Sequence, residues 1–337
     1  MHYILCKENH WVKTLQKELT ADFSKECVPV EGLPCIKIPS TIDLRGGYLA
    51  FSSTALINAT EIKEDSVTKQ ATQIMDILSE KIEAESEINF HAFALTDKFG
   101  VIETGRAEIF KDKIKTGLRK KKVSCLKKGF NRELPFLQIL ILGDRSIAVS
   151  YLSKEEMNDY HSLVSPFVGG FNNVADDKKA PSRAFKKIVE AQELLGVRIS
   201  EGETLVDLGA CPGGWSYIAR KSGARVIALD RSPLSPELME DTNVQFIKAD
   251  AFKYEPKRKI HWVVSDIIAA PERILELINY WVLEKKCQHF IFTIKFQGHK
   301  DYGLLKKFKK IAAECDFKVI LKQLNANKNE VTIMGSV

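Results

Sequence analysis

Between residues 204 and 334 the chain alternates between short apolar runs and longer segments with helical periodicity. This β/α alternation predicts an α/β fold, a parallel sheet with helices on both faces. Residues 325–329 alone join the last two expected strands. That is too short for a crossover, so the final strand is expected to run antiparallel. The expected strands are 204–208, 226–230, 244–249, 261–265, 290–294, 318–324 and 331–334, with helices at 215–222, 272–285 and 302–314.

The chain before residue 152 has the pattern of smaller α+β units. Their strands are expected at 2–6, 88–96, 136–142 and 147–151, and apolar periodicity predicts helices at 11–19 and 67–82. Residues 152–180 contain Gly-, Pro- and Asn-rich stretches without a sustained period. We therefore expect a linker and loop there, between two parts of the chain.

Composition excludes several classes of protein. With 337 residues, 45% of them hydrophobic and 28% charged, the chain is long enough for two domains and too apolar for wholesale disorder. Its apolar runs are all shorter than the ~18 residues that span a bilayer, and its first residues lack the pattern of a signal peptide. The seven cysteines form no C-x-x-C pair, which is typical of reduced thiols. We expect a cytoplasmic protein with no disulfide framework, metal site or membrane span.

The net charge of +6 is unevenly distributed. In the basic segment, residues 106–132, eleven basic residues stand against two acidic ones, so it carries +9 and the other 310 residues sum to −3. Such a patch favours a nucleic-acid partner, although a solvated lysine-rich helix face is the alternative. Ile114, Leu118 and Val123 would form the apolar stripe of a helix within 111–128. The candidate RNA contacts are Lys115, Arg119, Lys120, Lys121, Lys122, Lys127 and Lys128.

A glycine-rich turn lies within residues 205–216 (LVDLGACPGGWS), where the first of the seven strands ends in Asp207. Ligands of open α/β sheets bind at the carboxyl ends of the strands. Gly209, Gly213 and Gly214 would let the backbone approach such a ligand closely. The glycine spacing is not that of the G-x-G-x-x-G dinucleotide loop. With an acid in front, the turn suits a cationic, amino-acid-bearing nucleoside better than a pyrophosphate.

Two further aspartates end the next two strands. At Asp230 an acid can accept hydrogen bonds from both ribose hydroxyls, and at Asp250 from an adenine amino group. Each aspartate alone would more often be a helix cap or a turn residue, but three acids at successive strand ends favour a cofactor site. S-adenosylmethionine is the expected ligand. Cys211 has no base next to it in the sequence, so we interpret it as a loop residue and not a nucleophile.

Four charged residues are candidates for the chemistry. Lys187 lies in the helix before the first strand, Asp266 and Lys295 end the fourth and fifth strands, and Glu330 opens the last. Carboxyl ends of neighbouring parallel strands lie side by side, so Asp266 and Lys295 should be close. A partly desolvated lysine beside another lysine can act as a base near neutral pH, with carboxylates holding the geometry. The alternative, separate surface charges, is disfavoured by the apolar run 290–296 around Lys295.

The stretches DLGACPGGW, SRAFKK, SDI, FTIKF and NEVT together resemble the FtsJ-like family of RNA ribose 2'-O-methyltransferases. The resemblance runs through residues 165–337 and is weaker upstream. It implies a Rossmann-like, S-adenosylmethionine-dependent methyltransferase fold, with a mostly parallel seven-stranded sheet and an antiparallel last strand. It also implies a Lys-Asp-Lys-Glu tetrad in which Lys295 accepts the proton, supported by Lys187, Asp266 and Glu330.

The same resemblance implies which residues hold the cofactor. Ser182 and the loop from Cys211 to Gly214 would contact its methionine end. The spacing from Ser182 favours Lys187 over Lys186 as the first tetrad lysine. The full implied set is Ser182, Asp207, Gly209, Cys211, Pro212, Gly213, Gly214, Trp215, Asp230, Asp250 and Asp266.

The resemblance further implies a ferredoxin-like unit at 1–60, a THUMP-like RNA-binding domain at 61–155, a linker at 156–180 and the methyltransferase domain at 181–337. The implied activity is 2'-O-methylation of ribosomal RNA, at a cytidine of 23S rRNA. Another RNA substrate, or a non-catalytic RNA-binding or ribosome-assembly factor that retains the fold, is the alternative. Base methylation is disfavoured, because residues 265–269 offer neither a cysteine nor an Asn/Asp-Pro-Pro-aromatic turn.

Overall fold

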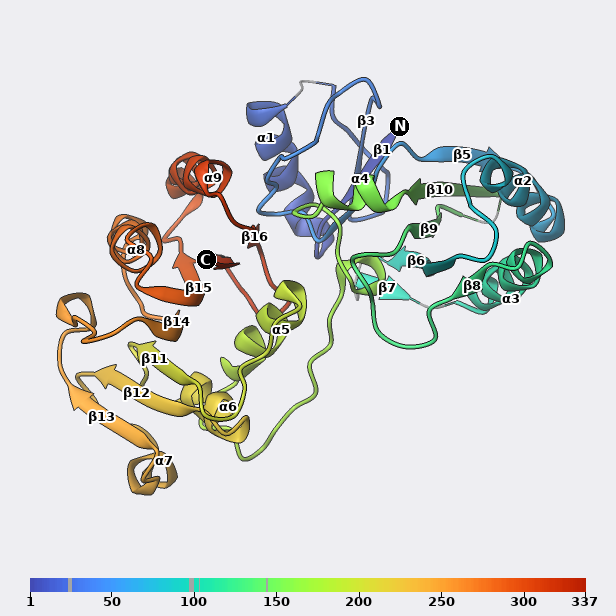
Figure 1. The fold of residues 1–337 in the computed structure, drawn as a ribbon. Coiled ribbons are helices and arrows are strands. Elements are labelled where there is room, and N and C mark those ends of the chain that lie inside the picture. The colour runs from blue at the N-terminus through green and yellow to red at the C-terminus, as the bar shows by residue number, and fades with distance from the viewer. Residues whose placement is uncertain (24–25, 97–99, 103, 144) are drawn as a thin grey trace. The chain divides into compact units, whose positions relative to one another are not determined.

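The computed structural model describes residues 1–23, 26–96, 100–102, 104–143 and 145–337. The chain divides into two compact units, an N-terminal unit, Met1–Asn172, and a C-terminal unit, Asn173–Val337 (Figure 1). Each unit has its own sheets and its own hydrophobic core, as expected for domains of this size.

The N-terminal unit begins with a small antiparallel sheet in the order β2-β3-β1-β4. Its strands are β1 (His2–Leu5), β2 (Val28–Pro29), β3 (Cys35–Ile38) and β4 (Thr54–Leu56). The 3₁₀ turn η1 (Asn9–Trp11) leads into helix α1 (Val12–Asp22), which buries Leu15 and Leu19. The first expected strand and the first expected helix are therefore confirmed.

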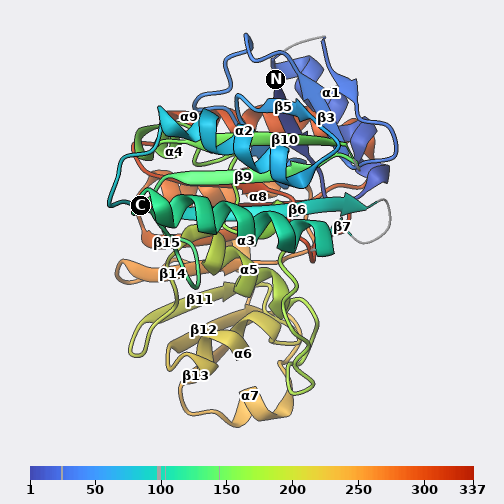
Figure 2. The same ribbon diagram turned by 90° about the vertical axis from the view of Figure 1, so that its right-hand side faces the viewer.

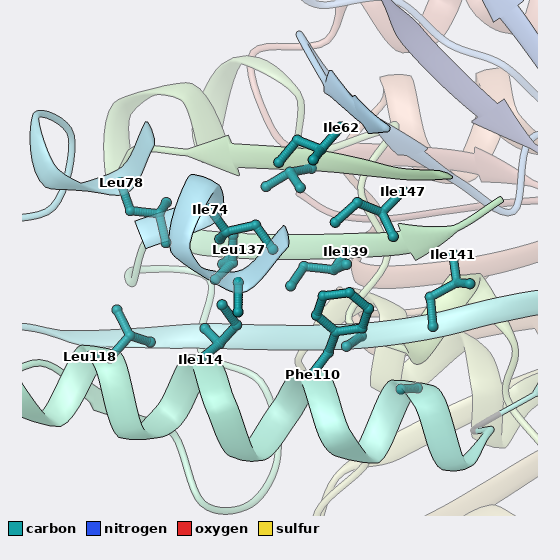
Figure 3. Close-up of a cluster of buried hydrophobic side chains, with 14 of the residues drawn as sticks. Ile62, Ile74, Leu78, Phe110, Ile114, Leu118, Leu137, Ile139, Ile141 and Ile147 are labelled. Atoms are coloured by element: carbon teal, nitrogen blue, oxygen red, sulfur yellow. The ribbon is translucent and has the colours of Figure 1, made fainter. Parts of the chain in front are cut away.

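A second sheet follows, in the order β5-β10-β9-β6-β7, with β8 paired to β6. Helices α2 (Val67–Ser79) and α3 (Gly105–Lys120) lie across one of its faces (Figure 2). Phe110, Ile114 and Leu118 of α3 point into the core between helix and sheet (Figure 3). The strands are β5 (Thr60–Lys63), β6 (Glu87–Thr96), β7 (Gly100–Ile102), β8 (Ser124–Cys125), β9 (Phe136–Ile141) and β10 (Ser146–Leu152).

The helix expected within 111–128 is wrong beyond Lys120, where α3 ends. Lys122 has a φ of 59°, in the left-handed region, and the Val123 N–H donates back to the Leu118 carbonyl at 3.0 Å. This is a Schellman ending, in which the residue after the left-handed one packs on the last helical turn. Val123 is buried because of that ending and not as part of a helical stripe.

Residues 153–172 continue the N-terminal unit. Ser153 caps the short helix α4 (Lys154–Asp159) by accepting from the Glu156 N–H, and Glu156 completes a capping box. The turn η2 (Val168–Gly170) then packs against Ser53. A Cβ on Gly170 would lie 2.5 Å from the Ser53 carbonyl carbon, so a glycine is needed at this close approach.

The C-terminal unit contains one seven-stranded sheet in the order β13-β12-β11-β14-β15-β17-β16. The pairs among β13, β12, β11, β14 and β15 are parallel, whereas β17 runs antiparallel to both of its neighbours. The mostly parallel sheet and the antiparallel last strand are confirmed. The strands are β11 (Thr204–Leu208), β12 (Arg225–Asp230), β13 (Val244–Lys248), β14 (Ile260–Ser265), β15 (Cys287–Lys295), β16 (Val319–Lys322) and β17 (Glu330–Ser336).

Helices cover both faces of this sheet (Figure 1). Helices α5 (Phe185–Leu195) and α6 (Gly214–Lys221) pack on one face, and α8 (Pro271–Ile278) and α9 (Leu305–Glu314) on the other. Shorter elements are η3 (Ala251–Lys253), α7 (Pro236–Glu240), η4 (Asn279–Leu283), which extends α8, and η5 (His299–Leu304). Among the helices in the described ranges, none is both long and apolar enough to cross a membrane.

Candidate active site

A cavity of about 660 Å³ opens at the carboxyl ends of β11, β12, β13 and β14. The loops that follow these strands form its walls, and the segment before α5 adds Ser182 and Ala184. Every residue expected to hold a cofactor lines this cavity except Gly213. The tertiary structure thus gathers the predicted cofactor residues around one space large enough for a small organic molecule.

Two glycines make the turn before α6 possible. Gly213 has a φ of 109°, and a Cβ there would lie 2.3 Å from Leu238 Cδ1. A Cβ on Gly214 would lie 2.4 Å from Ser182 Oγ, so the missing side chain lets Ser182 approach the start of the helix. Gly213 therefore allows the loop to pack against Leu238, while its neighbours Pro212 and Gly214 line the cavity.

Asp207 is the last residue but one of β11, and its side chain is buried inside the unit. Its Oδ2 accepts from the Ser216 N–H at 3.0 Å and from the Ser216 hydroxyl at 2.7 Å, which satisfies a donor in the first turn of α6. Burial raises the pKa of the Asp207 carboxyl to about 7, and these two hydrogen bonds act against that rise. Asp207 thus fastens α6 to the strand end while also reaching the cavity wall.

Asp230 and Asp250 act as turn residues and line the cavity at once. Asp230 accepts from the Cys211 N–H at 3.0 Å and from the Ser232 N–H at 2.9 Å. Asp250 accepts from the Phe252 N–H at 3.1 Å and caps η3. The two interpretations weighed from the sequence, local turn former or ligand acceptor, are therefore compatible at both positions, since each carboxylate also faces the cavity.

Sequence reasoning missed the apolar and cationic parts of the wall. The Arg273 guanidinium lies over the Phe252 ring, 4.1 Å from its centroid, and both line the cavity. Ile267 and Ile268 follow Asp266 on the next wall, and the Ile268 side chain is 90% exposed. Arg273 and Phe252 are far apart in sequence and form no motif. Ile268 could have been noted as an apolar residue two positions after a candidate catalytic acid.

The four residues of the tetrad form one cluster. Lys187 Nζ donates to Asp266 Oδ1 at 2.9 Å, to Asp266 Oδ2 at 3.1 Å and to Glu330 Oε2 at 2.6 Å. Lys295 Nζ lies 3.3 Å from Asp266 Oδ1 and 3.9 Å from Glu330 Oε1. The alternative of four separate surface charges is therefore wrong. Two cations and two carboxylates balance, so the charges can be held in a largely enclosed site.

Four different elements supply these side chains. Lys295 stands directly opposite Glu330 in the β15–β17 register, so both side chains project from the same face of the sheet. Asp266 follows β14, the neighbour of β15, and Lys187 lies in the first turn of α5. Lys186 pairs instead with Asp176 at 2.7 Å. The structure thus places Lys187, and not Lys186, in the cluster.

The two lysines of the tetrad differ in exposure. The Lys187 side chain is 8% exposed, whereas that of Lys295 is 21% exposed and lines the cavity together with Asp266. Lys187 has three short contacts to carboxylate oxygens and Lys295 has two longer ones. Lys295 is therefore the tetrad lysine that a molecule in the cavity can reach.

The candidate RNA contacts lie in the N-terminal unit, at the end of α3 and in the chain that follows. Arg119, Lys120, Lys122, Lys127 and Lys128 are exposed, and Lys115 and Lys121 are partly so. Lys122 forms an exposed ion pair with Glu85, 3.0 Å apart. The seven candidate RNA contacts do not form one helix face, because α3 ends before Lys121.

Burial lowers the pKa of the Arg132 guanidinium to about 10. This last residue of the basic segment is half-buried, and its Nη1 donates to the His161 carbonyl at 3.4 Å. Arg132 is thus less exposed than most of the cations that precede it. The surface charge of the basic segment comes from the residues before it.

The C-terminal unit is similar in sequence to a known protein family. Residues 180–336 match the FtsJ-like methyltransferase family. The C-terminal unit is an FtsJ-like methyltransferase domain. The predicted fold of this unit and the predicted family are thereby confirmed, and the match covers α5, the whole sheet and every residue of the tetrad.

Relatives extend the similarity beyond the FtsJ-like domain. The chain is 29% identical to ribosomal RNA large subunit methyltransferase M of Proteus mirabilis over 310 residues, 88% of this chain and 81% of that protein. It is 34% identical to the protein of the same name from Tolumonas auensis over 212 residues, 59% of this chain and 56% of that one. The second alignment thus spans little more than half of either protein.

TrmK of M. capricolum, in complex with S-adenosyl-homocysteine, superimposes with a TM-score of 0.33 and 11% sequence identity. The superposition covers 46% of this chain and 67% of that one.

Proposed function

We propose that this chain transfers the methyl group of S-adenosylmethionine to a ribose 2'-hydroxyl of ribosomal RNA. The observation that carries the proposal is the Lys-Asp-Lys-Glu cluster at the edge of the cavity of an FtsJ-like domain. The names of the relatives, which specify large-subunit ribosomal RNA, support the substrate class. We further propose a cytidine of 23S rRNA as the target nucleotide and the cytoplasm as the site of action.

The cavity fits the cofactor chemically. Asp230 and Asp250 present carboxylates that can accept from the ribose hydroxyls and the adenine amino group, and Phe252 offers an aromatic wall beside them. Ser182 and the backbone of the glycine loop, which also line the cavity, would contact the methionine end. When bound, S-adenosylmethionine supplies an electrophilic methyl group on a sulfonium. The carboxylates around the cavity are compatible with that positive charge.

In this proposal Lys295 is the base. In its neutral form, its Nζ would accept the proton of the 2'-hydroxyl, and the proton would then pass to water at the open side of the cavity. Asp266 and Glu330 hold Nζ in place, and Lys187 holds both carboxylates from the protein side. Most of the rate enhancement should come from placing the hydroxyl in line with the methyl group.

We propose that the N-terminal unit binds the RNA. Its two sheets, divided between β4 and β5, are the candidates for the ferredoxin-like unit at 1–60 and the THUMP-like domain at 61–155. Exposed cations of the basic segment can pair with phosphates, which gives affinity without sequence reading. Specificity for one nucleotide would then depend on the shape of the RNA and on contacts at the cavity.

The test is methyl transfer from radiolabelled S-adenosylmethionine to rRNA that lacks the modification. A 2'-O-methyl group removes the hydroxyl that attacks the phosphodiester, so the label should appear in an alkali-resistant dinucleotide. Label in an alkali-labile nucleotide would indicate base methylation and contradict the proposal. RNA binding without transfer, on both naked 23S rRNA and pre-ribosomal particles, would favour the non-catalytic binding factor instead.

A further inference from the structure

The tetrad is assembled from the two ends of the FtsJ-like domain. Lys187 and Glu330 are 143 residues apart, yet their side chains meet at 2.6 Å. Asp266 and Lys295 are fixed by neighbouring strands of one sheet. Lys187 comes instead from a helix packed on the sheet, so its position relative to Glu330 depends on how α5 is fastened to the last strands.

A second contact joins the same two segments. Glu190 lies three residues after Lys187 on α5, where residues i and i+3 share a helix face, and it is 3% exposed. Its two carboxylate oxygens each accept from the Asn325 N–H at 3.0 Å, and Oε1 also accepts from Asn325 Nδ2 at 2.9 Å. Asn325 lies in the connection between β16 and β17, five residues before Glu330.

The connection itself is internally braced. Asn327 Nδ2 donates to the Glu330 carbonyl at 3.3 Å and to Thr332 Oγ1 at 3.1 Å. Asn329 Nδ2 donates to the Phe296 carbonyl at 2.8 Å, and the Phe296 N–H donates back to the Asn329 carbonyl at 3.0 Å. A displacement of Asn325 would therefore be carried to Glu330, and through Phe296 to the adjoining Lys295.

We propose that Glu190 and Asn325 form a positioning clamp that sets the distance between Lys187 and Glu330. The inference rests on the proposed function, because it assigns the clamp a role in the same reaction. Neither residue lines the cavity, so the clamp acts through the tetrad and not on the cofactor. Hydrogen bonds to a buried carboxylate are strong and directional, which suits them to hold a spacing of this kind.

The test exchanges the polarity of the clamp. Glu190→Gln places an amide donor against the donors of Asn325, and Asn325→Asp places a second carboxylate against Glu190. In the double variant the new amide can donate to the new carboxylate while its oxygen still accepts from the backbone N–H. Glu193→Gln, the same change on the same helix, is the matched control, and Asn325→Ala is the milder substitute if either single variant fails to fold.

Each single variant should lower kcat by roughly 10–100-fold, the cost of misplacing reacting groups by about an ångström. The KM for S-adenosylmethionine should stay within about twofold, because the cavity wall is untouched. The double variant should recover to within about threefold of the parent, since the pair couples directly. Glu193→Gln should leave kcat unchanged. If the contact between Glu190 and Asn325 only stabilises the fold, the single variants should have a lower melting temperature and an unchanged kcat.

A readout without turnover separates this inference from the proposed function. The Cε signals of Lys187 and Lys295 in lysine-labelled protein should shift in each single variant and return in the double variant. If the parent transfers no methyl group, the proposed function fails and these signals alone decide on the clamp. The clamp would be contradicted if the lysine signals do not shift, or if the single variants keep the parent's kcat. It would also be contradicted if the kcat of the double variant is no higher than that of the slower single variant.

Discussion

Lysines gather in two regions of this molecule under opposite conditions. In the tetrad, two lysines share two carboxylates in a site where the side chains are 8–21% exposed. In the basic segment, cations such as Lys120, Lys127 and Lys128 are exposed, and this stretch of the sequence contains only two acids. The same side chain is held by a fixed network in the first region and surrounded by water in the second.

What a lysine side chain can do depends on how deeply it is buried. A desolvated lysine costs free energy unless it is paired, so its position is defined to within a hydrogen bond and it can serve chemistry. An exposed lysine has little fixed geometry and its interactions are screened by salt, but several together attract a polyanion.

Lys295→Ala should reduce methyl transfer by roughly 10²–10⁴-fold, the contribution typical of a general base. The affinity for S-adenosylmethionine should be nearly unchanged, because Lys295 is expected to act on the RNA hydroxyl. Single-turnover rates and calorimetry measure the two quantities. A variant that keeps more than about a tenth of the activity would exclude Lys295 as the base.

Lys187→Ala should destabilise the C-terminal unit by about 3–5 kcal/mol, because two largely buried carboxylates lose their nearest cation. Lys120→Ala removes an exposed cation for which the described residues show no ion pair. This variant should keep the parent's free energy of unfolding within error. Urea unfolding of both variants measures the difference. Equal free energies of unfolding would mean that Lys187 in the enclosed network contributes no more to stability than an exposed lysine does.

Asp230→Ala should weaken S-adenosylmethionine binding by about 1.5–3 kcal/mol for each hydrogen bond lost to a charged acceptor. The loop should also loosen, since Asp230 holds the Cys211 and Ser232 N–H groups. Glu237→Ala, an exposed acid on α7, is the matched control. Unchanged affinity by calorimetry would reduce Asp230 to a turn residue.

Replacing Arg119, Lys120, Lys121 and Lys122 with alanine should weaken rRNA binding and flatten its salt dependence. Each phosphate contact contributes roughly 0.7–0.9 to the logarithmic salt slope. Cofactor affinity should not change, because the cavity is built entirely from the C-terminal unit. The control replaces four exposed lysines scattered over the same unit, Lys13, Lys17, Lys63 and Lys81. If both quadruple variants bind alike, the basic segment is only a solvated surface.

Asp207→Asn should change how stability depends on pH. The pKa of Asp207 is raised to about 7, so between about pH 4 and 7 the folded state holds a proton that the unfolded state has released. The unfolding free energy therefore falls as pH rises through this window, by about 1.4 kcal/mol per unit of pKa difference.

An asparagine oxygen at the Oδ2 position can still accept both Ser216 donors, so the fold should persist in Asp207→Asn. The loss of stability between pH 5 and pH 8 should be smaller in this variant than in the parent. Urea unfolding at the two pH values measures it. An identical loss in both proteins would show that other groups dominate the pH dependence.

Local sequence pattern was a good guide wherever a structural feature is local. Asp207, Asp230 and Lys295 lie at or next to the carboxyl ends of apolar strands, and these ends meet at one edge of a sheet. The pattern failed at residues 121–128, because the left-handed Lys122 ends α3 and turns Val123 back onto it. An apolar residue at helical spacing cannot reveal that the backbone between has reversed.

Sequence pattern predicted the order of strands and helices, the glycine turn and the acids near the strand ends, and the family resemblance indicated which residues would form the tetrad. Tertiary structure decided which of them share a space: Lys187 with Glu330, Phe252 with Arg273, and Glu190 with Asn325. It also decided that Asp207 is buried and Lys295 accessible. The two kinds of feature differ in the distance along the chain over which they act. Periodicity and turn chemistry act over a few residues, whereas burial and ion pairing depend on segments brought together only when the sheet closes.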